Sequence, residues 1–185
     1  MNSLRCWIAA AFFALTLGAQ AQIVVGQTAG FTGPAAGGVK ETAEGAQLGV
    51  DAVNAKGGVH GQKIELLSLD DGFVPARAAD NARKLADDPK VLALFLTRGT
   101  PHTEAVLPVL EAAGLPLVAP STGAMSLHTP LRKYVFNVRA PYQREAGKAV
   151  THLYTTGIRR IAVVHADDSF GLDALEGART TLAGL

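Results

Sequence analysis

Apolar and polar positions follow two different periods along the chain, and their alternation predicts repeated β-α units. Short β-branched or apolar runs, typical of buried strands, are separated by segments in which apolar residues recur every three or four positions, typical of helices. We expect strands over 23–29, 63–69, 91–96, 115–119, 134–138 and 160–165. We expect helices with apolar faces within 39–53, 75–88, 100–113, 146–156 and 175–182. Strands alternating with helices in this way predict an α/β fold with a parallel sheet.

The first residues of the chain have a different pattern. Arg5 precedes an apolar run over 6–17, which is too short to span a bilayer and is followed by small residues up to Ala21. This pattern predicts a secretory signal peptide over 1–21, cleaved before Gln22, and export to the periplasm of a Gram-negative cell. A buried N-terminal helix is the alternative, but such a helix would carry a polar face, and the run offers only Thr16.

Charge and cysteine content exclude several classes of function. Seventeen Lys and Arg residues against sixteen Asp and Glu residues leave no positive excess for binding nucleic acid or for a basic membrane-surface helix. Cleavage of the signal would also remove Cys6, the only cysteine, so the mature chain is expected to have no disulfide, zinc cluster or thiol nucleophile. Because Cys6 lies inside the apolar run, we expect no stable membrane anchor through a lipid at that position.

The chain lacks the residue spacings that known cofactor-binding, metal-binding and catalytic motifs require. The glycine-rich segment 26–33 has Thr28 where a dinucleotide-binding loop needs glycine, and Val39 occupies the lysine position of a phosphate loop. The histidines show no metal-binding spacing on a helix. The pairs Asp70-Asp71 and Asp167-Asp168 each follow a predicted strand, where aspartate is favoured for capping. We therefore expect no cofactor, no metal and no catalytic residue.

Two loops at the carboxyl ends of neighbouring predicted strands carry the candidate site, because open parallel sheets bind ligands at that edge. One loop is 97–103, which contains Thr100, and the other is 120–124. Hydroxyls and backbone N–H groups beside a helix start suit a small carboxylate. For Thr100, an ordinary N-cap before Pro101 explains the residue as well as ligand contact does. For 121–124, ligand contact is favoured over capping, because the sequence shows no helix beginning there that these residues could cap.

Several segments together resemble the periplasmic binding proteins for branched-chain amino acids and related compounds, the substrate-capturing components of ATP-binding cassette importers. The asparagine-alanine-lysine-glycine-glycine segment 54–58 with Gly61 is the most specific of them. The others are 23–27, 32–34, 70–72, 99–101, 120–124, 134–139 and 168–171. Together they cover nearly the whole mature chain.

The resemblance implies a type I periplasmic-binding-protein fold, in which two α/β lobes close over a ligand. The first lobe, a Rossmann-like parallel sheet, would span 22–139, and 140–185 would hold the hinge crossover and the truncated start of the second lobe. In this family the loops after the third and fourth strands grip the ligand's carboxylate, and an aromatic residue of the second lobe covers it. Carried over, the ligand-binding residues are Thr100, Ser121, Thr122, Gly123, Ala124 and Phe170. The implied partners are a small amino acid or related carboxylate and ABC permease subunits.

Some positions depart from the family pattern or leave alternatives open. Arg98 stands where the family usually has an apolar or small residue; a solvated loop charge is favoured over a second anchor for an anion. For Phe170, a helix-start core residue is the alternative to ligand contact. A sensory domain of the same fold is the second functional candidate, and an exported α/β hydrolase using Ser121 with His128 is a third. Without the later strands of the second lobe, we expect weak ligand binding and unpaired edges at 160–165.

Overall fold

The computed structural model describes residues 22–185, and the signal peptide predicted over 1–21 lies outside the described residues. Its centre is a parallel sheet of five strands in the order β2-β1-β3-β4-β5. The strands are β1 (Ile23–Ala29), β2 (Ile64–Asp70), β3 (Val91–Phe95), β4 (Leu117–Val118) and β5 (Val135–Phe136). The expected parallel α/β architecture is confirmed, although the last two strands are shorter than 115–119 and 134–138.

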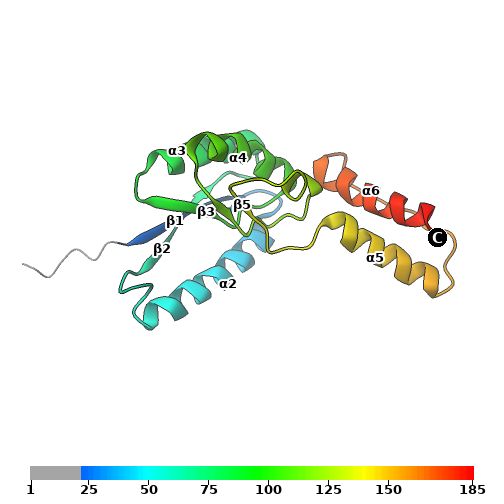
Figure 1. The fold of residues 1–185 in the computed structure, drawn as a ribbon, viewed down its shortest axis with the longest axis horizontal. Coiled ribbons are helices and arrows are strands. Elements are labelled where there is room, and N and C mark those ends of the chain that lie inside the picture. Colours follow the sequence, from blue (N-terminus) through cyan, green and yellow to red (C-terminus); the bar gives the residue numbers. More distant parts are fainter. Residues whose placement is uncertain (1–21) are drawn as a thin grey trace, which may run out of the picture.

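Helices lie on both faces of this sheet and beyond its end (Figure 1). They are α2 (Ala36–Ala55), α3 (Pro75–Asp87), α4 (Thr100–Ala113), the short 3₁₀ helix η1 (Met125–Leu127), α5 (Tyr142–Thr155) and α6 (Ser169–Ala183). Pro75 occupies the first turn of α3, and Gly114 ends α4 in the left-handed conformation, as the sequence predicts. Among residues 22–185, the structure contains no helix whose length and apolarity would let it cross a membrane.

The main core lies between the sheet and the α3–α4 layer. Leu94 of β3 and Leu117 of β4 are completely buried against Leu110 of α4, and Leu85 of α3 is buried with them. The opposite face is different, because the apolar stripe expected to point inward over 39–53 buries only Val39. Periodicity decides which residues share a helix face, but burial also requires a partner element against that face.

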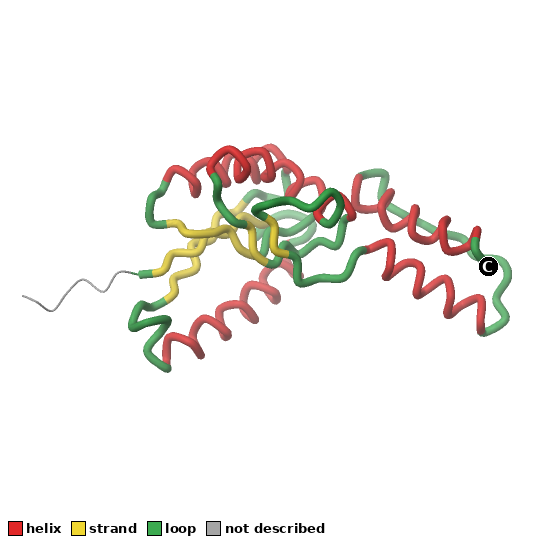
Figure 2. Tube along the Cα trace, viewed as in Figure 1, coloured by secondary structure: helices red, strands yellow, loops and turns green. Residues whose placement is uncertain are grey.

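The strand expected over 160–165 is not formed, which corrects the sequence prediction. The segment runs between α5 and α6 as an irregular connection, drawn as loop in Figure 2. A parallel strand needs a neighbouring strand to satisfy its backbone N–H and C=O groups, and the five-stranded sheet does not include this segment. Val164 is accordingly 98% exposed.

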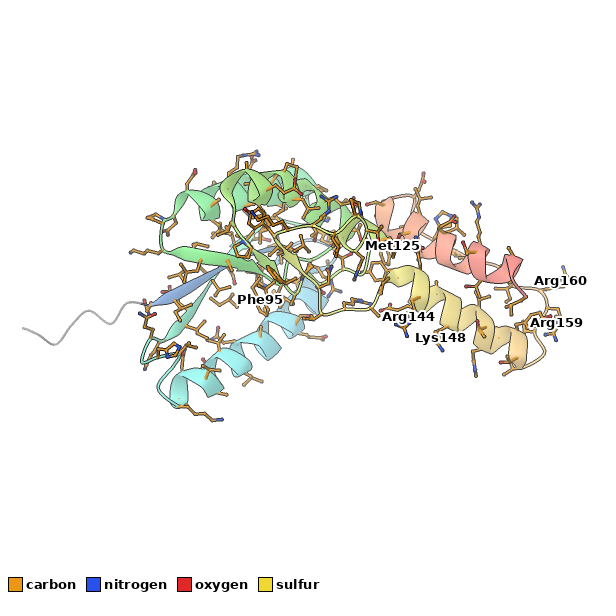
Figure 3. The ribbon with its side chains drawn as sticks, viewed as in Figure 1. Phe95, Met125, Arg144, Lys148, Arg159 and Arg160 are labelled. Atoms are coloured by element: carbon orange, nitrogen blue, oxygen red, sulfur yellow. The ribbon has the colours of Figure 1, made fainter. Side chains whose placement is uncertain are left out.

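Helices α5 and α6 form a pair that is joined to the sheet unit, residues 23–136, at one end. The backbone N–H of Tyr142 donates to the carbonyl oxygen of Gly123 at 2.7 Å, and the Ser169 hydroxyl donates to the Glu104 carboxylate at 2.7 Å. Met125 lies at this junction, whereas Arg159 and Arg160 lie at the far end of the pair (Figure 3). The geometry places the start of both helices beside the loops that follow β3 and β4.

Candidate ligand-binding site

The loops after β3 and β4 come together, as their positions in the sequence predict. Arg98 and Ser121 form a parallel β-bridge, in which the Ser121 N–H donates to the Thr97 carbonyl oxygen at 2.7 Å. Beside this bridge lies a cleft of about 460 Å³. Its walls come from both the sheet unit and the helical pair: Ala35, Phe73, Arg98, Gly99, Thr100, Pro101, His102, Ser121, Arg139, Tyr142, Ala166, Asp168 and Phe170.

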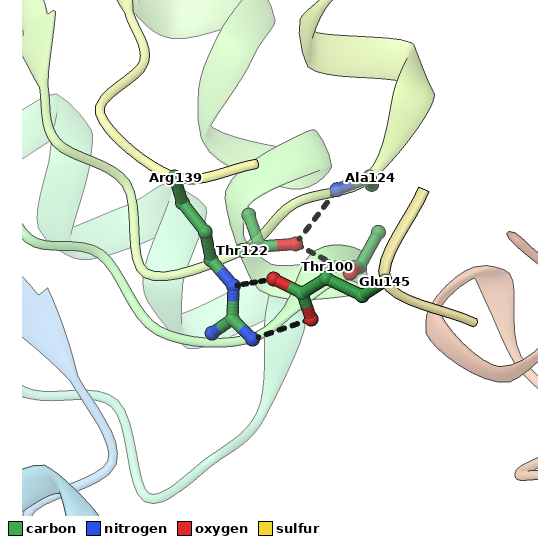
Figure 4. A network of polar contacts seen from close by, with 5 residues as sticks. All are labelled: Thr100, Thr122, Ala124, Arg139 and Glu145. Carbon is green, nitrogen blue, oxygen red and sulfur yellow. Dashed lines mark hydrogen bonds and ion pairs between the residues drawn. The ribbon is translucent and has the colours of Figure 1, made fainter. Parts of the chain in front are cut away.

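Thr100 lies at the first residue of α4 and lines the cleft. Its hydroxyl is 2.7 Å from the Thr122 hydroxyl, and both side chains are buried (Figure 4). The N-cap of α4 is instead Gly99, with a φ of 89° and no side-chain cap. The N-cap interpretation of Thr100 is therefore wrong. When Thr122 donates within the pair, the proton of the Thr100 hydroxyl is left for another acceptor.

Thr122, Gly123 and Ala124 lie behind the wall of the cleft. The Ala124 N–H donates to the Thr122 hydroxyl at 3.4 Å, and the Gly123 carbonyl oxygen receives the N–H of Tyr142. A Cβ atom on Gly123 would lie 2.3 Å from the carbonyl oxygen of Ala140, so only glycine lets the crossover pass this closely. These residues support the two loops, and direct ligand contact by them stays a prediction.

Phe170 faces the cleft from α6. Its ring meets the Tyr142 ring edge to face at a centroid distance of 5.1 Å, and the residue is 43% exposed. The alternative that Phe170 is a core residue at a helix start is therefore wrong. The N-cap of α6 is Asp168, whose carboxylate accepts the Gly171 N–H at 2.9 Å.

The two arginines of the cleft have different surroundings. Arg139 forms two hydrogen bonds to the Glu145 carboxylate, at 3.2 and 3.0 Å, and these raise the pKa of Arg139 above its usual value (Figure 4). Arg98 is half-buried, and within the described part of the chain no carboxylate lies within ion-pair distance of it. Arg98 lines the cleft, and its role as a solvated loop charge or as an anchor for an anion stays a prediction.

Phe73 and His102 line the same cleft and were not predicted from the sequence. Their rings stack with centroids 4.1 Å apart. His102 is only 4% exposed, and neither of its ring nitrogens has a hydrogen-bond partner among residues 22–185. Phe73 has a positive φ of 58° and lies inside a turn in which the Val74 N–H donates to the Asp71 carbonyl oxygen. The turn residues of 70–72 were a usable signal for Phe73, whereas nothing in the spacing of the histidines distinguishes His102.

The aspartates that precede Phe73 hold this turn in place. Asp71 is completely buried and accepts hydrogen bonds from the Thr28 hydroxyl at 3.0 Å and from the Phe73 N–H at 2.9 Å. Burial raises the pKa of Asp71 above its usual value. Asp70 is exposed, and the hydrogen bond from the Thr32 hydroxyl lowers the pKa of its carboxyl. Both side chains thus organise the loop that carries one wall of the cleft.

The geometry gives little support to the hydrolase alternative. His128 Nε2 is buried without a hydrogen-bond partner within residues 22–185, so this nitrogen does not activate the Ser121 hydroxyl. In the same range, the structure brings together no group of three His, Asp, Glu or Cys side chains that could hold a metal ion. The cleft offers hydroxyls, a helix start and the guanidinium of Arg98, which are groups that bind an anion, and it also contains the capping carboxylate of Asp168.

Comparison with known proteins gives the family. The sequence model that describes the periplasmic binding protein family matches residues 22–184. The chain belongs to the periplasmic binding proteins. The Leu/Ile/Val-binding protein homolog 7 of Brucella suis is 30% identical over 188 residues, which cover 95% of this chain and 47% of that protein.

Solved structures of periplasmic binding proteins share this fold. A possible leucine/isoleucine/valine-binding protein from Rhodopirellula baltica matches with a TM-score of 0.86 and 30% identity, over 91% of this chain and 46% of that one. A substrate-binding periplasmic protein from Ralstonia solanacearum matches with a TM-score of 0.84 and 36% identity, over 88% and 46%. The chain thus has the type I periplasmic-binding-protein fold and spans about half the length of these relatives.

Membership in this family agrees with the expected periplasmic location, and export and solute binding by this chain stay predictions. The matched relatives are named as binding proteins and not as enzymes. The cleavage site before Gln22 and the lobe boundaries at 139 and 140 stay predictions.

Proposed function

We propose that the chain captures a small carboxylate, an amino acid or a related compound, in the cleft and presents it to the permease of an ATP-binding cassette importer. The carboxylate lies at the start of α4, where Thr100 and Ser121 line the cleft. The first N–H groups of a helix have no partners within the helix, and the helix dipole favours an anion at this end.

The observation that carries this proposal is the convergence of the loops after β3 and β4 on one side of one cleft. The bridge between Arg98 and Ser121 fixes the two loops, and the hydroxyl pair of Thr100 and Thr122 joins them a second time. Polar groups held by two such links are in place before the ligand arrives, which reduces the entropy that binding costs.

Closure in this proposal takes place at the crossover 138–142. Arg139 and Tyr142 of this crossover line the cleft, and Phe170 follows on α6, so movement of the helical pair changes one wall only. A ligand that contacts both walls binds the closed arrangement better and shifts the population toward it.

The test is calorimetric and NMR titration of the purified protein with L-leucine and other small carboxylates. We expect Ser121→Ala and Thr100→Val each to weaken binding about 10-fold or more, because a hydrogen bond to a charged group contributes about 1.5–3 kcal/mol. Thr180→Val is the matched control, since Thr180 lies on exposed α6 surface and bonds only Glu176. Binding that is the same in all three variants, or the absence of binding by every carboxylate tried, would overturn the proposal.

A further inference from the structure

Aromatic rings line the cleft from both of its sides. Phe73 and His102 form a stacked pair on the sheet unit, with centroids 4.1 Å apart. Tyr142 and Phe170 form an edge-to-face pair on the helical pair, with centroids 5.1 Å apart. Aromatic faces and edges carry opposite partial charges, so a planar ring between such pairs gains offset-stacked and edge contacts that an aliphatic group does not.

On the side of the sheet unit, the cleft contains a positive charge, Arg98, that has no acidic partner among residues 22–185. Arg98 is half-buried beside the start of α2, and an ideal Cβ on Gly38 would lie 3.4 Å from its Nη2 atom. No carboxylate lies within ion-pair distance of Arg98 in the described residues, whereas the guanidinium of Arg139 is occupied by Glu145. A partly desolvated cation without a counter-ion is costly, and an anionic ligand group would remove that cost.

His102 is the buried member of the stacked pair on the sheet unit. The side chain is more than nine-tenths buried, it lines the cleft, and both ring nitrogens lack a partner within residues 22–185. Buried polar atoms are normally hydrogen-bonded, so each exception calls for an explanation. His102 lies in the first turn of α4, and its Nδ1 would be 2.6 Å from a Cβ atom on Gly99. Its stacked ring thus supports Phe73 as an aromatic wall of the cleft.

We infer that the cleft is built for a planar aromatic carboxylate, with its acidic group at Arg98 and the start of α4 and its ring between the two aromatic pairs. The inference rests on the proposed function, because it assumes that the cleft binds a carboxylate. It goes further in naming the class of ligand: an arene or heteroarene acid is preferred to an aliphatic acid of the same size.

The test compares benzoate with cyclohexanecarboxylate, two probes that share the acid and nearly the same size and differ in aromaticity. Binding is followed by NMR titration of the purified protein. We expect benzoate to bind tighter by roughly three- to tenfold, the contribution of aromatic pairing beyond buried area. We also expect benzoate to shift the imidazole signals of His102.

Three leucine variants show where that preference arises. Phe73→Leu and Phe170→Leu keep apolar volume but remove a ring from one wall each, and each should bring the two affinities toward parity. Phe170 is 43% exposed, so its variant is expected to fold even where Phe73→Leu does not. Phe136→Leu is the matched control, because Phe136 is 54% exposed on β5 and does not line the cleft.

The outcomes separate the inference from the proposed function. Equal affinity for the two probes, or a preference for benzoate that survives Phe73→Leu and Phe170→Leu, overturns the aromatic assignment while leaving capture of a carboxylate intact. Binding of L-leucine without measurable binding of benzoate also overturns the aromatic assignment and leaves capture of a carboxylate intact. Failure of every carboxylate to bind overturns both.

Discussion

Replacing Gly123 by alanine is the sharpest test of how the crossover fits against the loop after β4. The new Cβ atom would lie 2.3 Å from the carbonyl oxygen of Ala140 and 3.1 Å from the backbone N of Tyr142. Both are backbone atoms, so no side-chain rotation relieves the collision, and the crossover must move. That movement also stretches the 2.7 Å hydrogen bond from the Tyr142 N–H to the Gly123 carbonyl oxygen.

The expected cost follows from these two effects. Overpacking at a tight site costs about 1–3 kcal/mol, and losing a backbone hydrogen bond adds about 0.5–1.5 kcal/mol. We therefore expect Gly123→Ala to lower the free energy of unfolding by about 2–4 kcal/mol. Urea unfolding followed by circular dichroism measures it, and hydrogen exchange of the Tyr142 amide reports on the broken bond directly.

Gly45→Ala is the matched control. An added Cβ on Gly45 meets nothing within 4 Å, and the residue lies in the middle of α2. Alanine is a better helix former than glycine, so this variant should raise the free energy of unfolding by about 0.5–1 kcal/mol. If Gly123→Ala unfolds at the same urea concentration as the parent while Gly45→Ala behaves as stated, the close approach of the crossover is refuted.

Two further predictions concern buried polar groups. Thr122→Val removes the partner of the buried Thr100 hydroxyl and should lower the free energy of unfolding by about 1–3 kcal/mol, measured by urea unfolding, whereas Thr122→Ser should recover most of it. The pKa of Asp71 is raised in the folded protein, so above the ordinary value of 3.8 the unfolded chain loses a proton that the folded chain keeps, and stability falls as pH rises through this window. Asp71→Asn should therefore gain stability relative to the parent as pH rises from about 4, the pKa range of a free aspartate; a difference independent of pH would contradict it. Asp70, with a lowered pKa, acts in the opposite sense, and its contribution is lost as pH falls below 3.8.

Local pattern predicted the elements well where their partners are close by. The bounds of β1 match the expected 23–29, and Pro75 and Gly114 mark helix ends as expected, because turn and capping preferences act within a few residues. The strand at 160–165 and the buried stripe of α2 failed for a shared reason. Both expectations identified an apolar segment correctly, but burial and pairing depend on an element elsewhere that the local sequence does not specify.

The sequence predicted where the candidate site lies better than it predicted which residues line the cleft. Thr100, Ser121 and Phe170 line the cleft, since loops after adjacent parallel strands must meet at one edge. The sequence placed His102 and Arg98 in the candidate loop 97–103 but favoured neither as a ligand-binding residue. Their significance lies in missing partners, and the absence of a hydrogen bond or counter-ion is a property of the packed structure.

The position of β1 in the sheet has a consequence for how the chain folds. Its first described strand lies between β2 and β3, so Val24 pairs with Glu65 on one side and with Val91 on the other. Strand β1 therefore lacks at least one of its two neighbours until β3 has been synthesised, by which point most of the sheet unit has been made. Such pairings between distant segments slow folding, because loop closure must precede any gain from contact. We expect the emerging chain to remain open and accessible over that interval, and β1 to gain both neighbours only when β3 arrives, before β4 and β5 extend the sheet.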